Sequence, residues 1–78
     1  MSNLEKYTKI FTESFEVDAE RVKTLKYQDV EAWDSIGHMN LISLLEEAFD
    51  IFFEGDDILA LSSYEIGKGI LAKYDIEL

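Results

Sequence analysis

The spacing of apolar residues along the chain predicts helices and no strands. Apolar residues recur every three or four positions from Leu4 to Phe15, which is the period of one helix face. Ser2 and Glu5 stand at the spacing of a capping box, in which each side chain bonds the backbone N–H of the other residue. We therefore expect a first helix over about residues 3–15.

A longer helical pattern begins at about Ser35 and ends near Asp50. Placed at about 100° per residue, its apolar positions form a core stripe with two flanking residues. The stripe comprises Leu41, Leu45, Ala48 and Phe49, and the flanking residues are Ile42 and Leu44. Polar residues occupy the opposite face, where Ile36 and Met39 fall near Ser35. Two apolar residues among acids favour a contact patch, although single exposed apolar residues are common on protein surfaces.

The segment between these helices, residues 16–33, has no sustained period. Asp18 can cap one helical turn there. Four isolated apolar residues predict that the segment packs over the core: Val17, Val22, Leu25 and Val30. Ordered loops of this length are uncommon in small domains and are often functional.

The last third of the chain predicts one short and one longer helix. The segment Glu54-Gly55-Asp56 ends the second helix, and residues 57–61 form a short third helix at most. A capping box and a hydrophobic staple precede a last helix over about 63–74: Ser62 with Glu65, and Leu61 with Ile66. Gly67 and Gly69 either weaken this helix by about 1 kcal/mol each relative to Ala or permit close packing.

These elements predict an all-α fold in a single domain, residues 1–78. The expected architecture is a small four-helix bundle of three longer helices plus one short helix.

Acidic residues are concentrated in one part of the chain, and their distribution says more than the net charge of -10. Residues 1–26 and 68–78 are each neutral overall, whereas residues 27–67 carry ten acids and no Lys or Arg. A field of one sign repels nucleic acids and anionic membranes and attracts basic protein surfaces. An interaction surface is therefore favoured over general solubility as the reason for the acidity.

The composition indicates neither secretion nor membrane insertion. The chain has no cysteine, no apolar run long enough to span a bilayer and no basic-then-apolar signal at its N-terminus. We expect a cytoplasmic monomer that binds neither nucleic acid nor membrane.

Ser35 and His38 raise the question of nucleophilic catalysis, which has little support. A serine nucleophile needs a base and a group that orients it, whereas His38 stands toward the core side of its helix and is expected to be a packed or rim residue. A calcium site at residues 54–57 lacks the required ligand pattern, so a solvated loop is expected at Glu54, Asp56 and Asp57. Helix physics alone makes Ser35 an N-cap, although a helix N-terminus also suits an attached phosphate.

The segment Trp33-Asp34-Ser35-Ile36-Gly37-His38 and the helix after it closely resemble the attachment segment of acyl carrier proteins. That family typically shows Asp-Ser-Leu before a helix ending in Glu-Glu-x-Phe-x, which Glu46-Glu47-Ala48-Phe49-Asp50 matches. The likeness covers nearly the whole chain, including Val17-Asp18 in the first loop and Leu61-Ser62-Ser63 before the last helix. Ile36 replaces the usual leucine, and the proline often found after the second helix is absent. The motif is closer to carriers of specialised pathways than to the fatty-acid carrier.

The resemblance implies a discrete carrier that is not itself an enzyme. Ser35 would bear a 4′-phosphopantetheine arm, transferred from coenzyme A by a separate phosphopantetheinyl transferase, and the arm would hold acyl or aminoacyl cargo as a thioester. The implied docking face for basic patches on that transferase and on acyl-loading and acyl-transferring enzymes comprises Asp34, Ile36, Met39, Glu46 and Glu47. Whether the interior shelters the cargo is left open, because three bulky residues can fill it: Phe49, Phe52 and Phe53. The alternative function is an acidic helical adaptor that binds basic partners without a prosthetic group.

Overall fold

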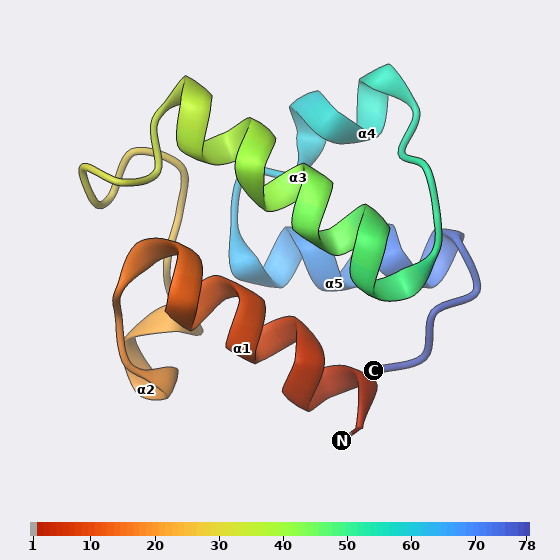
Figure 1. Cartoon of the computed structure of the whole chain (residues 1–78), viewed down its shortest axis with the longest axis horizontal. Coiled ribbons are helices and arrows are strands. Elements are labelled where there is room, and N and C mark those ends of the chain that lie inside the picture. Colours follow the sequence, from red (N-terminus) through yellow and green to blue (C-terminus); the bar gives the residue numbers. More distant parts are fainter. Residues whose placement is uncertain (1) are drawn as a thin grey trace.

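The computed structural model describes residues 2–78, so Met1, the first residue of the expected domain, lies outside the described residues. Five helices follow one another, and residues 2–78 contain no strand (Figure 1). The helices are α1 (Asn3–Phe15), α2 (Ala19–Val22), α3 (Ser35–Phe49), α4 (Gly55–Ala60) and α5 (Tyr64–Lys73). The all-α class predicted from the apolar spacing is confirmed.

Three longer helices follow the predicted pattern, and two short helices lie between them. The capping box that precedes α1 is present, with Ser2 and Glu5 each bonding the backbone N–H of the other at 3.1 and 3.2 Å. Asp18 caps α2 by accepting a hydrogen bond from a backbone N–H of that turn at 2.8 Å. The short helix α4 begins at Gly55, two residues earlier than the segment 57–61 predicts.

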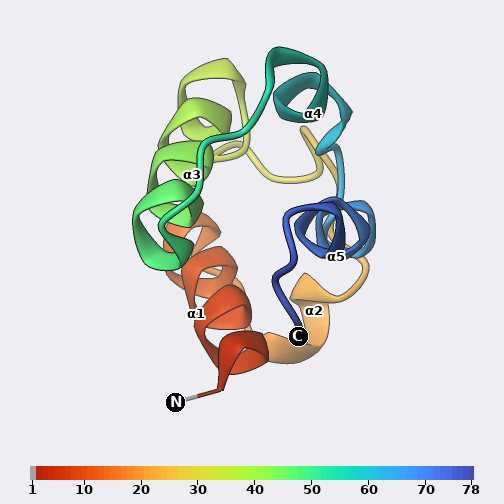
Figure 2. The ribbon, with the colours of Figure 1, turned by 90° about the vertical axis from the view of Figure 1, so that its right-hand side faces the viewer.

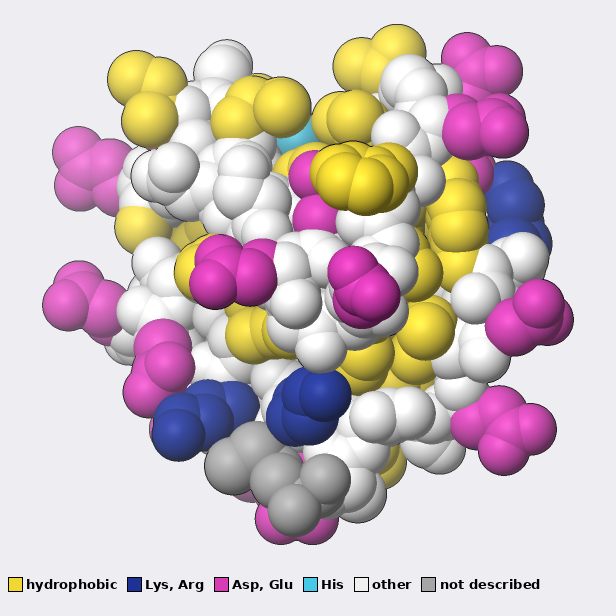
Figure 3. Space-filling view, turned by 45° about the vertical axis from the view of Figure 1, so that its right-hand side comes forward, with side chains coloured by type: hydrophobic (Ala, Val, Ile, Leu, Met, Phe, Trp, Pro, Cys, Tyr) yellow, Lys and Arg dark blue, Asp and Glu magenta, His cyan; other side chains and the backbone are white. Residues whose placement is uncertain are grey.

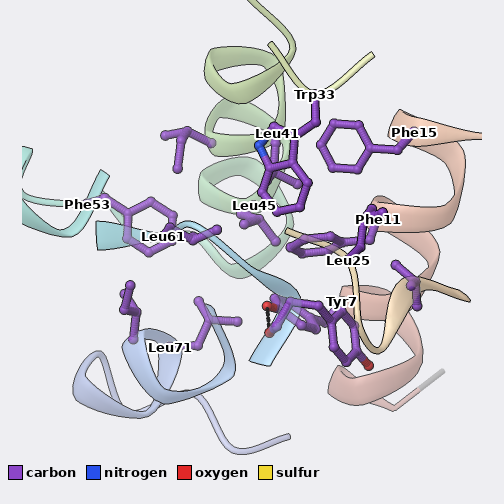
Figure 4. Close-up of a cluster of buried hydrophobic side chains, with 14 of the residues drawn as sticks. Tyr7, Phe11, Phe15, Leu25, Trp33, Leu41, Leu45, Phe53, Leu61 and Leu71 are labelled. Carbon is purple, nitrogen blue, oxygen red and sulfur yellow. Dashed lines mark hydrogen bonds between the residues drawn. The ribbon is translucent and has the colours of Figure 1, made fainter. Parts of the chain in front are cut away.

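The helices form two layers. In one layer α1 and α3 pack against each other and run in opposite directions (Figure 1). The other layer contains α4 and α5, and α2 lies below α5 in the same view (Figure 2). Side chains from both layers and from the loop between α2 and α3 fill the space between them (Figure 4).

The loop before α3 is anchored in the core by its largest side chain. Val22, Leu25 and Trp33 are fully buried, which confirms that residues 16–33 pack over the core. The Trp33 ring stacks on Phe15, with centroids 4.6 Å apart and an interplanar angle of 12°. It also meets the ring of Phe11 edge-on at 5.7 Å, and Figure 4 shows these aromatic side chains converging from the loop and from α1.

Two apolar residues expected in or beside the core lie at the surface. The prediction that Leu44 flanks the core stripe of α3 is wrong, because its side chain is 44% exposed while Leu45 beside it is fully buried. Phe52 does not fill the interior, since it is 85% exposed. Its neighbour Phe53 turns inward and packs edge-on against Tyr74 at 5.3 Å.

The helix α5 begins one residue later than the predicted capping box implies. Ser63 is the N-cap, and its hydroxyl accepts a hydrogen bond from the backbone N–H of Ile66 at 3.0 Å. The predicted pairing of Ser62 with Glu65 is therefore wrong. The predicted staple is wrong as well, because Leu61 is buried in the core whereas Ile66 is exposed.

Close packing of α5 on α1 depends on Gly67. A Cβ at Gly67 would collide with the hydroxyl of Tyr7, which donates a hydrogen bond to the backbone carbonyl of Tyr64 at 2.6 Å. Burial, together with the nearby Tyr64 and Glu65, raises the pKa of the Tyr7 hydroxyl far above its usual range. A Cβ at Gly69 would meet no neighbouring atom. Gly69 therefore weakens the helix and, unlike Gly67, has no packing role.

Asp57 fastens α4 to α5. Its carboxylate accepts hydrogen bonds from the Lys73 ammonium and from the Tyr74 hydroxyl, both at 2.6 Å. These bonds, that of Lys73 first, hold the pKa of Asp57 below its usual range. The expectation of a solvated loop is wrong for Asp57, which is buried. No group of three or more metal-binding side chains occurs within residues 2–78.

Candidate functional site

Asp34 is the residue that caps α3. Its backbone is extended, and its Oδ1 atom accepts a hydrogen bond from the backbone N–H of Gly37 at 2.8 Å. Ser35 is the first residue inside the helix. The N-cap role that helix physics alone assigns to Ser35 is therefore wrong, and its hydroxyl is not used for capping.

The Ser35 side chain is exposed beside Tyr27. The two hydroxyl oxygens lie 3.5 Å apart, which is longer than an ordinary O–H···O bond. The Tyr27 ring is held in place by edge-on contacts with Trp33 at 6.4 Å and with His38 at 5.6 Å. The serine hydroxyl therefore stands next to a fixed aromatic side chain without being tied to it.

Gly37 allows the preceding loop to pass close to the first turn of α3. A Cβ at this position would lie inside the contact distance of the Ala32 carbonyl oxygen. The loop is also closed on itself, since the backbone N–H of Gln28 donates to the carbonyl of Trp33 at 3.0 Å. The position of Ser35 is thus set by backbone packing as well as by the buried indole of Trp33.

Both ring nitrogens of His38 are engaged in hydrogen bonds. The indole N–H of Trp33 donates to Nδ1 at 3.0 Å, so Nδ1 carries no proton in this arrangement. Nε2 lies 2.7 Å from the carbonyl oxygen of Ile58 and donates to it in that tautomer. The prediction of a packed or rim residue at His38 is confirmed, because the ring is half-buried and joins the loop, α3 and α4. Neither nitrogen is free to accept the proton of the Ser35 hydroxyl.

A cavity of about 340 Å³ opens beside Ser35, between the start of α3 and α4. Apolar side chains dominate a lining made of Tyr27, Ser35, His38, Met39, Ile58, Leu59, Leu61 and Ser62. Figure 3 shows hydrophobic side chains gathered at this end of the molecule, with the histidine between them. The volume lies at the lower end of the range for small-molecule sites.

The residues expected to dock partners have different surroundings. Ile36 is 75% exposed, and Met39 is exposed at the rim of the cavity. Glu47 is also exposed, whereas Glu46 is half-buried and accepts a hydrogen bond from the backbone N–H of Phe53 at 2.9 Å. Glu46 therefore closes the turn after α3 in addition to contributing negative charge.

Sequence reasoning missed two residues beside Ser35. Tyr27 stands in the loop and Leu59 stands in α4, where it is 82% exposed at the edge of the cavity. A helix of six residues is too short for its apolar spacing to identify an outer face. The loop has no period at all, so the approach of Tyr27 to Ser35 carries no sequence signal.

No protein-family model matches this sequence, and a search of curated proteins found no match. Within residues 2–78, none of the helices has both the length and the apolar character needed to cross a membrane.

Proposed function

We propose that the chain is an acyl carrier protein, a four-helix carrier domain with α2 as an additional single turn, that bears 4′-phosphopantetheine on Ser35. The observation that supports this most is that two adjacent residues at the start of α3 have different roles. Asp34 caps the helix, and the Ser35 hydroxyl is left exposed one residue later. A hydroxyl that capped the helix would have to give up its hydrogen bond before it could be modified.

The surroundings of Ser35 suit an attached phosphodiester. The first turn of a helix has backbone N–H groups without intrahelical partners, and the positive end of the helix dipole favours an anion. The charge of Asp34 opposes a phosphate, but one of its oxygens is already bonded to the N–H of Gly37. The Tyr27 hydroxyl is a further donor close to the attachment oxygen. The arm, when attached, supplies the thiol that holds cargo as a thioester.

The surface around Ser35 suits brief docking by enzymes with basic patches. Asp34, Ile36 and Met39 place a charge and two exposed apolar side chains next to it. Glu47 and part of Glu46 extend the acidic surface along α3. Electrostatic steering speeds such encounters without requiring tight binding. We expect the partners to be a phosphopantetheinyl transferase and the acyl-loading and acyl-transferring enzymes of a specialised pathway, acting on a cytoplasmic, monomeric carrier.

The proposal treats the chain as a carrier without catalytic activity of its own. Its serine lacks a free base, because Trp33 and the carbonyl of Ile58 occupy both nitrogens of His38. A serine nucleophile without a base is a poor catalyst.

Mass spectrometry tests the proposal directly. Incubation with coenzyme A and each of several phosphopantetheinyl transferases should add the mass of one arm, and peptide mapping should locate it on Ser35. The Ser35→Ala variant should stay unmodified while keeping the circular dichroism of the wild type. Ser43→Ala is the matched control, since Ser43 is an exposed serine on the same helix and its removal should leave modification intact. A wild-type protein that accepts no arm from any of these transferases would refute the carrier proposal.

An acidic helical adaptor is the second candidate. The exposed side chains of Ile36, Leu59 and Phe52 provide apolar contact surface that needs no prosthetic group. An adaptor would bind its basic partner equally well as wild type and as Ser35→Ala. A carrier would lose all cargo loading in that variant, so the two candidates are distinguished by one substitution.

A further inference from the structure

We infer that the cargo tethered to Ser35 is a short acyl group and that Trp33 and His38 set its length limit. This inference rests on the proposed carrier function. Hydrogen bonds join three groups beside this cavity: the imidazole of His38 and the backbone carbonyl of Ile58, whose residues line it, and the indole of Trp33, which donates to His38. We call these three groups the clasp.

The cavity is the sheltered space nearest to anything attached at Ser35, because Ser35 itself lines it. Leu59 and Leu61 help to make its lining mostly apolar, while Tyr27 and Ser62 add hydroxyl groups. An apolar lining favours an acyl chain over charged cargo. A volume of about 340 Å³, at the lower end of the range for small-molecule sites, limits the length of chain that the cavity can hold.

His38 and Ile58 form part of the cavity lining, and Trp33, which bonds His38, is fully buried in the core. Two hydrogen bonds hold the clasp together, from the Trp33 indole to His38 at 3.0 Å and between His38 and the Ile58 carbonyl at 2.7 Å. Within the clasp, the Trp33 ring lies nearly parallel to the ring of His38, at an interplanar angle of 14°. On its other side it lies nearly parallel to the ring of Phe15 in α1, at an interplanar angle of 12°. Three stacked rings therefore extend from the cavity to α1, and Phe11 packs edge-on against the central ring.

A long chain that entered the interior between His38 of α3 and Ile58 of α4 would open the clasp and move α4 away from α3. Opening would leave the indole N–H of Trp33 and the carbonyl of Ile58 without partners, and it would displace a ring from a closely packed core. The helix α4 is also held from its other side, where Asp57 bonds Lys73 and Tyr74. A short group gains apolar burial in the cavity without any of these losses.

A series of acylated carriers tests the inference. Acetyl, butyryl, hexanoyl, octanoyl and palmitoyl pantetheine arms can be attached to Ser35 from the corresponding acyl-coenzyme A with a permissive transferase. The thermal midpoint and the rate of thioester cleavage by hydroxylamine report shelter, and the indole N–H resonance of Trp33, the only tryptophan, reports the clasp. The thermal midpoint and the resistance of the thioester to hydroxylamine should rise with chain length through the short members of the series and then stop rising. The indole resonance should stay in place throughout.

Two results would overturn the inference. One is a palmitoyl carrier that is more stable and more slowly cleaved than every shorter form. The other is an indole resonance that moves progressively as the chain lengthens. An unmodified Ser35 would instead refute the carrier proposal itself, so the two failures are distinguishable by intact mass alone.

Variants of the clasp locate the length limit. His38→Ala should let the octanoyl and palmitoyl arms gain protection that they lack in the wild type, and Trp33→Phe should do the same while keeping an aromatic ring. Ser43→Ala is the matched control, because Ser43 is exposed on α3 outside the cavity and its removal should leave the length profile unchanged. Equal profiles in wild type, His38→Ala and Trp33→Phe would show that the clasp does not set the limit.

Discussion

The hydrogen bond between Trp33 and His38 can be measured as an energetic coupling. Trp33→Phe removes the N–H donor but keeps a ring that can stack on Phe15. His38→Ala removes the acceptor together with the bond to the Ile58 carbonyl. A double-mutant cycle of these two substitutions separates the shared bond from the other effects of each change.

The geometry of the clasp sets the expected magnitudes. Trp33 is fully buried, so Trp33→Phe loses ring volume and leaves Nδ1 of His38 unpaired, at a combined cost of about 2–4 kcal/mol. His38→Ala leaves the buried indole N–H without an acceptor and should cost about 1–3 kcal/mol. Both variants lose the same bond, so the double variant should be more stable than the sum predicts by about 0.5–1.5 kcal/mol.

Urea unfolding followed by far-UV circular dichroism provides the free energies, since tryptophan fluorescence is lost in every variant that carries Trp33→Phe. A constant concentration of a stabilising osmolyte keeps the double variant folded at zero urea. The matched control cycle combines Trp33→Phe with Tyr74→Phe, and these two changes should add because Tyr74 bonds α4 from its other side. A coupling between Trp33 and His38 below about 0.3 kcal/mol would fall within ordinary additivity and would refute the clasp.

Three further predictions concern the packing around the site and the two ends of the pH range. Gly37→Ala should lower the free energy of unfolding by about 1–3 kcal/mol, because its Cβ would collide with the Ala32 carbonyl. The control Gly69→Ala should raise the free energy of unfolding by about 0.5–1 kcal/mol, because its Cβ meets no neighbouring atom. Urea midpoints that shift in the same direction in both variants would contradict this prediction. The raised pKa of Tyr7 means that its contribution to stability is complete below the unfolded-state value of about 10 and declines above it. Alkaline unfolding should therefore be shallower in Tyr7→Phe, and equal slopes would exclude this cause. The lowered pKa of Asp57 gives the opposite dependence, so the stability difference between wild type and Asp57→Asn should shrink as pH falls below about 4, and a difference independent of pH would exclude that link.

The longer helices could be predicted because their signals are local. The capping box at Ser2 and Glu5 and the spacing up to Phe15 predict α1 with the bounds that the structure shows. The start of α3 was also predicted at the observed residue. These signals depend on neighbours a few residues apart, where sequence distance and spatial distance agree.

Capping could not be predicted to the residue, because two adjacent side chains can each do it. Asp34 and Ser35 both suit an N-cap, as do Ser62 and Ser63, and in each pair the backbone conformation decides between them. Asp34 and Ser63 are the extended residues, and they are the ones that cap. The loops leading into both helices fix those conformations through contacts that no short motif records.

The clasp and the cavity depend on contacts that are distant in sequence. The carbonyl that His38 bonds belongs to Ile58, 20 residues away. The ring on which Trp33 stacks belongs to Phe15 in the first helix. Neither pairing follows from periodicity, because Trp33 stands in a loop without a period. The site could therefore be predicted as a motif, but its surroundings could not.

Three consecutive residues at the start of α3 point toward three different environments. Trp33 is buried against α1, Asp34 is bonded to the helix backbone, and Ser35 faces solvent. Because these residues are adjacent, burial of the indole fixes the backbone that presents the serine, and the cap fixes the direction in which the helix leaves. Exposure of the Ser35 hydroxyl is therefore a consequence of how tightly its neighbours are held. A substitution that loosens Trp33 should therefore loosen the backbone that holds the Ser35 hydroxyl in its exposed position. The rate at which a transferase attaches the arm to Ser35 is expected to fall more in Trp33→Ala than in Ile36→Ala.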